Sequence, residues 1–557
     1  MQTLDTDVLI AGGGPCGLML ANELGRRGIR TLLVDMKPGT AFNPQANATQ
    51  ARTMEHFRRL GFAHEVRSQG LPADHPTDIA YFTRYTGWEL ARLSLPTAAE
   101  AVRKVRGLGG AWSAAELPHR VSQKFVEAIL RRHAEAHGTN DIRYGWRLAE
   151  FEDTGEEIDA VVCPHPRPPR EGVGVTRVRA KYLVGADGPR SLVRSTLGIP
   201  WGGGTGVRRD FMGGQMFAVY LRAPRFYEVF PHARAWMYVS VNAERRAFMA
   251  SVDGQSEFAF HAAVHEGEDA ERWSEADARR TFAQALGREI PIEVLSCGTW
   301  TAGHSLVAQS FQRGRVFLAG DAAHLFTPTG GLGYNTAVED AVNLAWKLAG
   351  AVRGLAAPAL LASYEIERKP LAVRNTGYAR HFADSVGLFP ARPLLEEDGP
   401  AGDAARREAS LHLDAHVRLE FNIPGVTFGG RYDRSPLIVA DGSTPPPDEP
   451  NNYLPTACPG GRPPHAWLQD GTSLFDSFHA EWTLLALGPR VPATAAFEQA
   501  AQALGLDLRV VHHGAPALRE LYEAPLALVR PDQVVAWRGS HSRGAERIVR
   551  KAAGFSW

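Results

Sequence analysis

The glycines at positions 12, 14 and 17 constrain the fold of this 557-residue chain more than any other feature of its sequence. They follow the apolar run DVLIA at 7–11 and precede a segment with helical spacing, so the pattern predicts a strand, a turn and a helix. At this spacing the chain can turn sharply at Gly12, bring bare backbone against a pyrophosphate at Gly14, and pack helix on strand at Gly17. Pro15 lies in the same turn, and the helix N-terminus favours phosphate charge.

A second predicted strand, TLLVD at 31–35, ends in Asp35, 18 residues beyond Gly17. A carboxylate at this point can accept hydrogen bonds from both ribose hydroxyls of an adenosine, whereas it would repel the 2'-phosphate of NADP. The window therefore predicts an adenine-dinucleotide site, with FAD and NAD as alternatives. An ordinary glycine-rich turn is the competing interpretation.

Two later segments favour a flavin. KYLVGADGPRSLVRSTLGI at 181–199 predicts a strand, a Gly-Ala-Asp-Gly turn and a helix, and the segment at 315–350 predicts a strand, a glycine-rich loop and a long helix. Asp321, directly after the second strand, is placed to accept a hydrogen bond from a ribityl chain. Backbone N–H groups of the loop at 328–335 and the helix dipole can hold negative charge at flavin N1–C2=O. A glycine-rich turn capped by Asp321 is the alternative.

These three segments, in this order and spacing, resemble the class A flavoprotein aromatic hydroxylases, the family of phenol hydroxylase and p-hydroxybenzoate hydroxylase. RTMEHFRRLGF at 52–62, HRVSQKFVEAIL at 119–130, SYEIERKPLA at 363–372 and LVRPDQVVAWRG at 528–539 extend the resemblance over nearly the whole chain. The motifs and the resemblance together assign FAD contacts to Gly12, Gly14, Pro15, Gly17, Asp35, Arg52, Gln123, Asp187, Gly320, Asp321, Pro328, Gly331, Gly333, Tyr334 and Asn335.

By this resemblance Gly333, Tyr334 and Asn335 lie along the isoalloxazine edge, and the backbone of Pro328 faces the substrate. The chain departs from the family pattern at Gln45, where many relatives carry an arginine, and at Asn47, where some phenol hydroxylases place a histidine. The base that deprotonates the substrate therefore differs in this chain. Candidate ionisable groups near the substrate are His119, Arg120, Tyr81 and Tyr85, and we assign His119, Tyr85 and Pro328 as the catalytic set.

Short aromatic and β-branched runs at 215–221, 235–242 and 246–254 predict a β-sheet between the flavin segments. In the resembling family such a sheet covers the flavin and walls the substrate site. An equally weighted alternative is that its aromatic residues are ordinary sheet-core or surface side chains. The candidate substrate-binding residues are Tyr81, Tyr220, Trp236, Tyr238 and Met249.

The last third of the chain changes character. A helix is expected to about residue 385, followed by a solvated segment at 396–409 and a rigid polar linker at 440–450. Strands are expected at 464–471, 481–488, 506–514 and 526–539, an arrangement that resembles the thioredoxin-like domain of phenol hydroxylases. A redox role is not expected there, because Cys458 stands alone.

The predicted fold class is α/β, with a Rossmann-like FAD-binding domain, an inserted β-sheet substrate domain and a C-terminal thioredoxin-like α/β domain. The expected boundaries are 1–80, 116–200 and 301–395 for the FAD-binding domain, 81–115 and 201–300 for the substrate domain, 396–450 for a linker, and 451–557 for the C-terminal domain.

The composition of the chain excludes some classes of binding partner. The chain has 61 Lys and Arg against 61 Asp and Glu, so it lacks the basic charge that nucleic-acid or anionic-membrane binding requires. The four cysteines are isolated in the sequence, which excludes a disulfide framework. The histidines form no cluster of the kind that binds a metal, so we expect no metal site. The N-terminus is acidic and is not followed by a long apolar run, so we expect a cytoplasmic protein. We expect the partner to be a small aromatic substrate. The sequence leaves open whether the chain forms a homodimer.

A single dinucleotide fingerprint means that the nicotinamide must bind transiently. The resemblance then implies a monooxygenase that uses FAD, NADPH or NADH, and O2 to hydroxylate a phenolic ring through a flavin C4a-hydroperoxide. Two alternatives stay open. The first is oxygenation of a larger polyketide or antibiotic by hydroxylation, epoxidation or Baeyer–Villiger insertion, and the second is a non-catalytic flavin-binding redox sensor.

Overall fold

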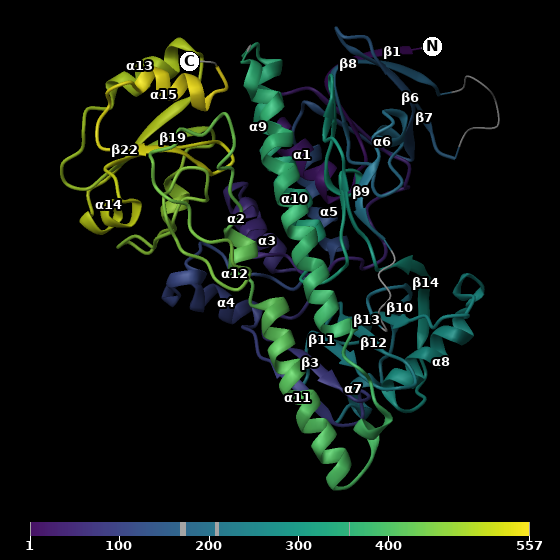
Figure 1. The fold of residues 1–557 in the computed structure, drawn as a ribbon. Coiled ribbons are helices and arrows are strands. Elements are labelled where there is room, and N and C mark those ends of the chain that lie inside the picture. The colour runs from purple at the N-terminus through teal and green to yellow at the C-terminus, as the bar shows by residue number, and fades with distance from the viewer. Residues whose placement is uncertain (1, 167–173, 206–210, 356, 556–557) are drawn as a thin grey trace.

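A computed structural model describes residues 2–166, 174–205, 211–355 and 357–555. Two long helices, α9 (Leu332–Val352) and α10 (Pro358–Gly387), run through the middle of the molecule. A nucleotide-binding sheet, a second sheet and a C-terminal α/β unit surround these helices (Figure 1). The arrangement matches the predicted α/β fold class.

The nucleotide-binding sheet has the order β16-β17-β8-β1-β2-β5. Its parallel strands are β1 (Gln2–Ala11), β2 (Thr31–Asp35), β5 (Asn140–Tyr144), β8 (Thr176–Gly185) and β17 (Val316–Leu318). Antiparallel β6 (Trp146–Asp153), β7 (Ile158–Pro164) and β16 (Gln312–Arg313) complete it. Helix α1 (Pro15–Gly25) packs between α5 (Gln123–Glu135) and α9. Because Ala11 pairs with both Val34 and Gly185, the carboxyl ends of β1, β2 and β8 meet at one edge.

The second sheet has the order β14-β10-β13-β12-β11-β3-β4. Its strands are β3 (Ile79–Phe82), β4 (Glu89–Leu93), β10 (Gln215–Arg222), β11 (Met237–Ser240), β12 (Ala247–Ser251), β13 (Glu257–Ala263) and β14 (Glu293–Thr301). The strands predicted at 215–221, 235–242 and 246–254 are confirmed as β10, β11 and β12. The outer face packs on α7 (Phe226–Val229) and α8 (Glu275–Leu286), and the inner face packs in a separate apolar cluster with α11 (Pro400–Phe421).

Shorter elements connect these parts. They are α2 (Ala51–Arg59), α3 (Ala63–Arg67), α4 (Ala98–Lys104), α6 (Leu192–Thr196), β9 (Trp201–Gly204), β15 (Ser305–Ala308), β18 (His324–Leu325) and α12 (Pro424–Phe428).

The segment predicted as a linker at 396–450 contains a long helix, so this prediction is wrong for its first half. Helix α11 spans Pro400–Phe421 and packs against β4. Its apolar residues recur every four positions, as Ala405, Ala409, Leu413 and Val417, and all four are buried in the cluster on the inner sheet face. Charged residues fill the opposite side, which is why the sequence around 396–409 suggested a solvated segment. Residues 440–449 carry neither helix nor strand.

The C-terminal unit has the sheet order β20-β19-β21-β22, with β19 and β20 parallel and the other pairs antiparallel. Its elements are β19 (Trp482–Leu487), α13 (Ala495–Ala503), β20 (Leu508–His513), α14 (Pro516–Tyr522), β21 (Leu526–Val529), β22 (Val535–Gly539) and α15 (Ala545–Ala552). The strand predicted at 464–471 is wrong, because that segment makes only an isolated bridge from Trp467 to Ser473.

A buried ionic network docks this unit onto α9 and α10. Glu367 of α10 accepts hydrogen bonds from Lys347 of α9 at 2.7 Å and from both terminal nitrogens of Arg530 at 2.7 and 2.9 Å. All three side chains are fully buried. Burial alone would raise the pKa of the Glu367 carboxyl, but the charges of Arg530 and Lys347 outweigh it and hold that pKa well below its usual range.

In the part of the chain that the structure describes, no helix has both the length and the apolar character that crossing a membrane requires. The same residues contain no group of three or more His, Cys, Asp or Glu side chains arranged to hold a metal ion.

The docking network predicts a large stability difference between two conservative variants. Glu367→Gln keeps the side-chain shape but leaves Lys347 and Arg530 charged and buried, which we expect to cost about 3–5 kcal/mol. Glu135→Gln, which breaks an exposed pair with Arg131, serves as the control and should cost less than about 1 kcal/mol. Urea unfolding of the two variants measures the difference, and equal losses would contradict the role given to Glu367.

Candidate functional site

The three predicted flavin segments meet at the carboxyl edge of the nucleotide-binding sheet. A Cβ on Gly12 would lie 2.1 Å from the carbonyl oxygen of Ala186, so the first and second segments touch through bare backbone. Ala319 N donates to Gly185 O at 3.0 Å, which joins the second segment to the third. A Cβ on Gly320 would lie 3.1 Å from Cys16 Cβ and close the ring of contacts.

The turn before α1 has the features that a pyrophosphate requires. Gly17 packs so tightly that a Cβ there would lie 1.9 Å from Gly12 O, whereas a Cβ on Gly14 would meet no atom within 4 Å. Gly14 is the N-cap of α1 and Pro15 is its first residue. Open space beside the N-terminus of this helix fits a bound phosphate, since the helix end carries partial positive charge.

Asp35 lies at the end of β2, half-buried beside this turn. Its Oδ2 accepts from Gly13 N at 2.6 Å and its Oδ1 from Lys37 N at 2.7 Å. The Tyr144 hydroxyl holds the same turn by donating to Gly13 O at 2.7 Å. Each carboxylate oxygen keeps a further lone pair, so the predicted contact of Asp35 with a ribose is compatible with its role in fixing the turn.

Asp321 and Asp187 differ in their surroundings. Asp321 is exposed, and among the described residues none is hydrogen-bonded to its carboxylate. Protein atoms packed around it nevertheless raise its pKa. A free carboxylate at this edge fits the hydroxyl donors of a ribityl chain. Asp187 is already engaged, because it accepts from Ser191 Oγ at 2.5 Å and from Val193 N at 3.1 Å and so caps α6.

The loop before α9 has the predicted bare backbone. Gly330 and Gly331 have φ values of +63° and +64°, a left-handed conformation that favours glycine. Gly330 N donates to Glu420 Oε1 at 2.8 Å, so one N–H group of the loop is bound by α11. Glu420 was not predicted as a site residue, because it lies in the segment 396–450 that was expected to be a linker.

The side chain of Asn335, which is predicted to lie along the isoalloxazine edge, is engaged by protein atoms. Its Oδ1 accepts from Gln50 N at 2.8 Å and Thr53 Oγ1 at 2.7 Å. Its Nδ2 donates to Ala48 O at 2.9 Å and Gly331 O at 2.6 Å. Four protein partners saturate the amide, which therefore ties residues 48–53 to the start of α9.

The neighbouring predicted residues take different positions. Gly333 faces Phe326, whose ring a Cβ would approach to 3.4 Å, and Tyr334 is half-buried. Gln123 is the first residue of α5. Its backbone N–H donates to Ala46 O at 2.6 Å, and its side-chain Nε2 donates to Glu127 Oε1 at 2.6 Å. FAD contacts from Gly333, Tyr334, Gln123, Gly331 and the exposed Pro328 stay predictions.

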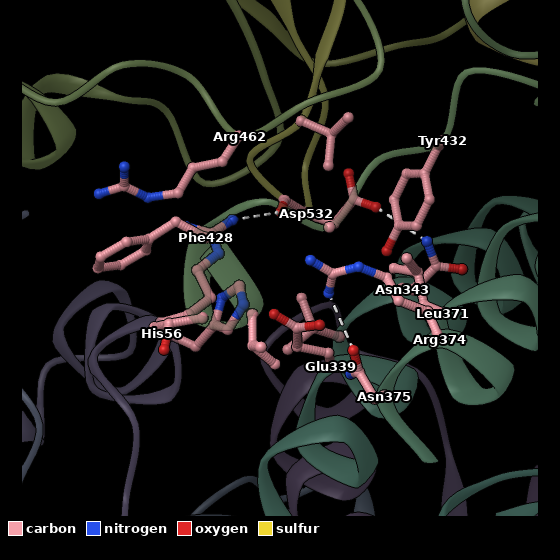
Figure 2. A pocket seen from close by; sticks show the side chains of 16 residues that line it. His56, Glu339, Asn343, Leu371, Arg374, Asn375, Phe428, Tyr432, Arg462 and Asp532 are labelled. Carbon is pink, nitrogen blue, oxygen red and sulfur yellow. Dashed lines mark hydrogen bonds between the residues drawn. The ribbon is translucent and has the colours of Figure 1, made fainter. Parts of the chain in front are cut away.

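The Arg52 guanidinium is engaged by protein atoms, and its predicted contact with FAD stays a prediction. It donates to Glu55, to the carbonyl oxygens of Asp532 and Gln533, and to the Gln533 side chain. Arg52 thus lines a cavity of about 40 Å³ between α2, α9, α10 and the C-terminal unit (Figure 2). The buried His56 Nδ1 and Asn343 Oδ1 have no partner there, so ordered water fits this cavity.

Strand alternation divides the predicted substrate residues between the two faces of the second sheet. Tyr81 and Trp236 lie in the apolar cluster on the inner face, together with Ala48. Ala48 is close to the predicted flavin loop, because a Cβ on Gly331 would lie 2.9 Å from the Ala48 Cβ. Tyr238 and Met249, with the catalytic candidate Tyr85, lie fully buried in the outer cluster on α7 and α8. Burial on the outer face argues against substrate contact through Tyr238 and Met249 and against a catalytic role of Tyr85, and these assignments stay predictions.

Tyr220 lies toward the edge of the sheet that carries β14. Its hydroxyl accepts from Lys124 Nζ at 2.6 Å and donates to Glu257, and Phe42 packs edge-on against its ring at 5.6 Å. An engaged hydroxyl of this kind has a structural role, so substrate contact through Tyr220 stays a prediction.

His119 pairs through its backbone with Thr49, at 2.8 and 2.9 Å, and its side chain is buried. Burial and the nearby charge of Arg67 lower its pKa to about 3, so the imidazole is neutral over the range in which a phenol ionises. His119 supports the segment that touches the flavin loop; its burial and low pKa make it a weak base, and its catalytic assignment stays a prediction.

Asp340 of α9 is a buried group that the sequence analysis did not identify. Its carboxylate accepts from Gly320 N at 3.1 Å, His324 Nε2 at 2.6 Å and Arg368 Nε at 2.7 Å. Asp340 thereby fixes the third flavin segment to α9 and α10.

The open space at Gly14 predicts a variant that folds but binds FAD weakly. Gly14 has φ −78° and ψ −174°, which any residue adopts, so Gly14→Val should leave the unfolding midpoint of the apoprotein unchanged. The added methyl groups would occupy the phosphate position, and we expect FAD affinity to fall by about tenfold or more. Titration of the apoprotein with FAD measures the loss, and undiminished affinity would contradict the phosphate assignment.

The burial of His119 and Tyr85 predicts that neither handles the substrate proton. In His119→Gln and Tyr85→Phe, the pH profile of the hydroxylation implied by the family resemblance should match that of the natural chain. Steady-state rates across the phenol ionisation range test this. A displaced acidic limb in His119→Gln would restore His119 as the base.

Known proteins share both parts of this architecture. Residues 5–378 match the family model described as FAD binding domain, and residues 456–554 match the model described as aromatic-ring hydroxylase, C-terminal. The chain is 31% identical to "FAD-dependent monooxygenase apdD" of Emericella nidulans, over 98% of this chain and 90% of the relative. It is 29% identical to "2,4-dichlorophenol 6-monooxygenase" of Delftia acidovorans, over 96% and 95% of the two chains.

Among solved structures, the rebeccamycin biosynthetic enzyme RebC with reduced flavin superposes with a TM-score of 0.88 at 32% identity, covering 100% of both chains. This similarity spans the nucleotide-binding sheet, the second sheet and the C-terminal unit together. The matching models, the relatives and the converging flavin segments show that the chain belongs to the FAD-dependent aromatic-ring hydroxylases, a family of flavoprotein monooxygenases.

Proposed function

We propose that this monooxygenase uses NADPH or NADH and O2 to hydroxylate a phenolic ring of a planar aromatic substrate. The observation that carries the proposal is a row of half-buried rings on the inner face of the second sheet. Phe248 and His261 stack at 4.5 Å between ring centres, and Trp300 meets His261 edge-on at 5.6 Å. Flat aromatic faces of this kind bind flat aromatic ligands by stacking.

The row is uncharged. Trp300 Nε1 donates to His261 Nδ1 at 3.1 Å, which requires that Nδ1 carries no proton. Burial lowers the pKa of His261 to about 4, in agreement with a neutral ring near pH 7. An apolar wall of this kind excludes water from the reacting centre, which oxygen chemistry on a reduced flavin requires.

The inner face is wide. Tyr81 on β3 and Trp300 on β14 belong to strands five steps apart in the sheet order, which corresponds to about 24 Å at the usual strand spacing. This width favours a fused-ring substrate over a single phenol ring. The similarity to RebC, a rebeccamycin biosynthetic enzyme, supports the same choice, while the similarity to a dichlorophenol monooxygenase supports a phenolic ring.

Bound FAD supplies the two-electron chemistry that couples NAD(P)H oxidation to O2 activation. Within the chain, Gly14 and α1 would bind the pyrophosphate, Asp321 would orient the ribityl chain, and the loop at 328–335 would hold charge beside the ring. His416 and Glu420 of α11 lie at that loop, with His416 Nε2 3.0 Å from Glu420 Oε2. The Tyr81 ring lies edge-on to His416 at 6.0 Å, which joins α11 to the inner sheet face.

Anaerobic stopped-flow reduction tests the proposal. Bound FAD should be reduced by one of NADH and NADPH at least about tenfold faster with a fused-ring phenol than without ligand, and less accelerated by phenol itself. Trp300→Ala should lose the acceleration. Trp273→Ala, which removes a tryptophan packed on the outer face, is the matched control and should keep it.

If no phenolic ligand of any size accelerates reduction in the natural chain, the proposed hydroxylation is contradicted and the redox-sensor alternative takes its place. If phenol alone accelerates reduction, the substrate is a single ring and the width argument is wrong.

A further inference from the structure

Arg120 is a buried cation without an acidic partner. The residue is 7% exposed, and its guanidinium lies 4.5 Å above the Trp236 ring and 5.9 Å from the Phe421 ring. Across residues 2–166, 174–205, 211–355 and 357–555, no side chain forms an ion pair or hydrogen bond with this guanidinium. Burial lowers its pKa to about 10, which still leaves the group charged at pH 7.

This arrangement is unusual within the molecule. Three other buried arginines, Arg368, Arg462 and Arg530, each contact one or more carboxylates. A buried charge is costly unless it is paired, and cation–π contact with tryptophan offsets only about 2 kcal/mol of that cost. The unpaired N–H groups of the Arg120 guanidinium are therefore suited to bind an anion that comes from a ligand and not from the protein.

The position of Arg120 lies on the substrate side of the site. Its neighbour His119 is paired with Thr49, and Ala48 contacts the flavin loop at Gly331. Trp236 precedes β11 on the inner sheet face, and Phe421 ends α11. Arg120 is thus enclosed by the sheet wall, by α11 and by the segment that touches the flavin loop, whereas the phosphate position at Gly14 belongs to α1.

We propose that Arg120 binds a carboxylate on the aromatic substrate and so makes the enzyme selective for an aromatic acid. The guanidinium meets a carboxylate with two parallel N–H···O bonds, which fixes the orientation of the ring as well as its affinity. Trp236 holds the guanidinium plane from one side and leaves the donor edge for the ligand. This inference rests on the proposed function, since it assumes that the inner sheet face receives the substrate.

Equilibrium binding to the oxidised FAD-bound enzyme tests the inference without turnover. The probes are 3-hydroxy-2-naphthoate and its methyl ester, which differ in charge but share the ring system, and the readout is the flavin difference spectrum. The acid should bind about ten- to a hundredfold more tightly than the ester. Arg120→Met should abolish this preference while leaving ester affinity unchanged, and Arg120→Lys should keep part of it.

Arg106→Met is the matched control, because Arg106 also lies over a tryptophan ring, at 5.3 Å from Trp467, but is exposed and remote from the site. It should bind both probes as the natural chain does. The inference is overturned if the acid binds no better than the ester, if its advantage survives in Arg120→Met, or if Arg120→Met loses FAD while the preference persists. Because binding is measured without NAD(P)H, a failure of hydroxylation would leave this result intact and distinguishable.

Discussion

The buried carboxylate of Asp340 is the interaction on which the flavin site depends. It binds the backbone of Gly320, the ring of His324 and the guanidinium of Arg368, and so joins the end of β17 to two long helices. Burial alone would raise the pKa of Asp340, but His324 and Arg368 outweigh it and keep the carboxyl ionised. With Gly320 fixed, Asp321 is held outward at the sheet edge and the loop at 328–335 is held at the start of α9.

Two further parts of the chain brace this arrangement from opposite ends. At the N-terminus of α9, Glu420 of α11 binds Gly330 N, so a helix of the last third of the chain completes the flavin loop. Farther along α9, Lys347 pairs with Glu367 of α10 and, through it, with Arg530 of the C-terminal unit. The C-terminal unit therefore stabilises the helices that position the site.

The glycine segments could be predicted from the sequence because each depends on a local backbone requirement. Gly12 and Gly17 approach other backbone atoms too closely for any side chain, and this constraint is visible in their spacing. The direction of a strand residue is not local in the same way. Tyr81 and Phe82 are adjacent in β3, and only the packing of whole layers decides which one faces the flavin loop. The same packing of layers places Tyr85, Tyr238 and Met249 in the outer cluster.

Polar side chains and amphipathic helices set a second limit. Arg52 stands in a family segment, yet carbonyl groups more than 450 residues away determine where its guanidinium lies. Helix α11 was missed because its buried stripe begins with two alanines, which carry a weak apolar signal beside many charged neighbours. Both features depend on contacts between distant segments, which the local sequence does not show.

A crystal structure of the enzyme with bound FAD tests the central claim most directly. The account predicts the pyrophosphate against Gly14 and α1, a ribityl hydroxyl on Asp321, and the isoalloxazine ring between the loop at 328–335 and the inner face that carries Trp236. An isoalloxazine ring bound on the outer face of the second sheet, or in the cavity beside Arg52, would contradict it.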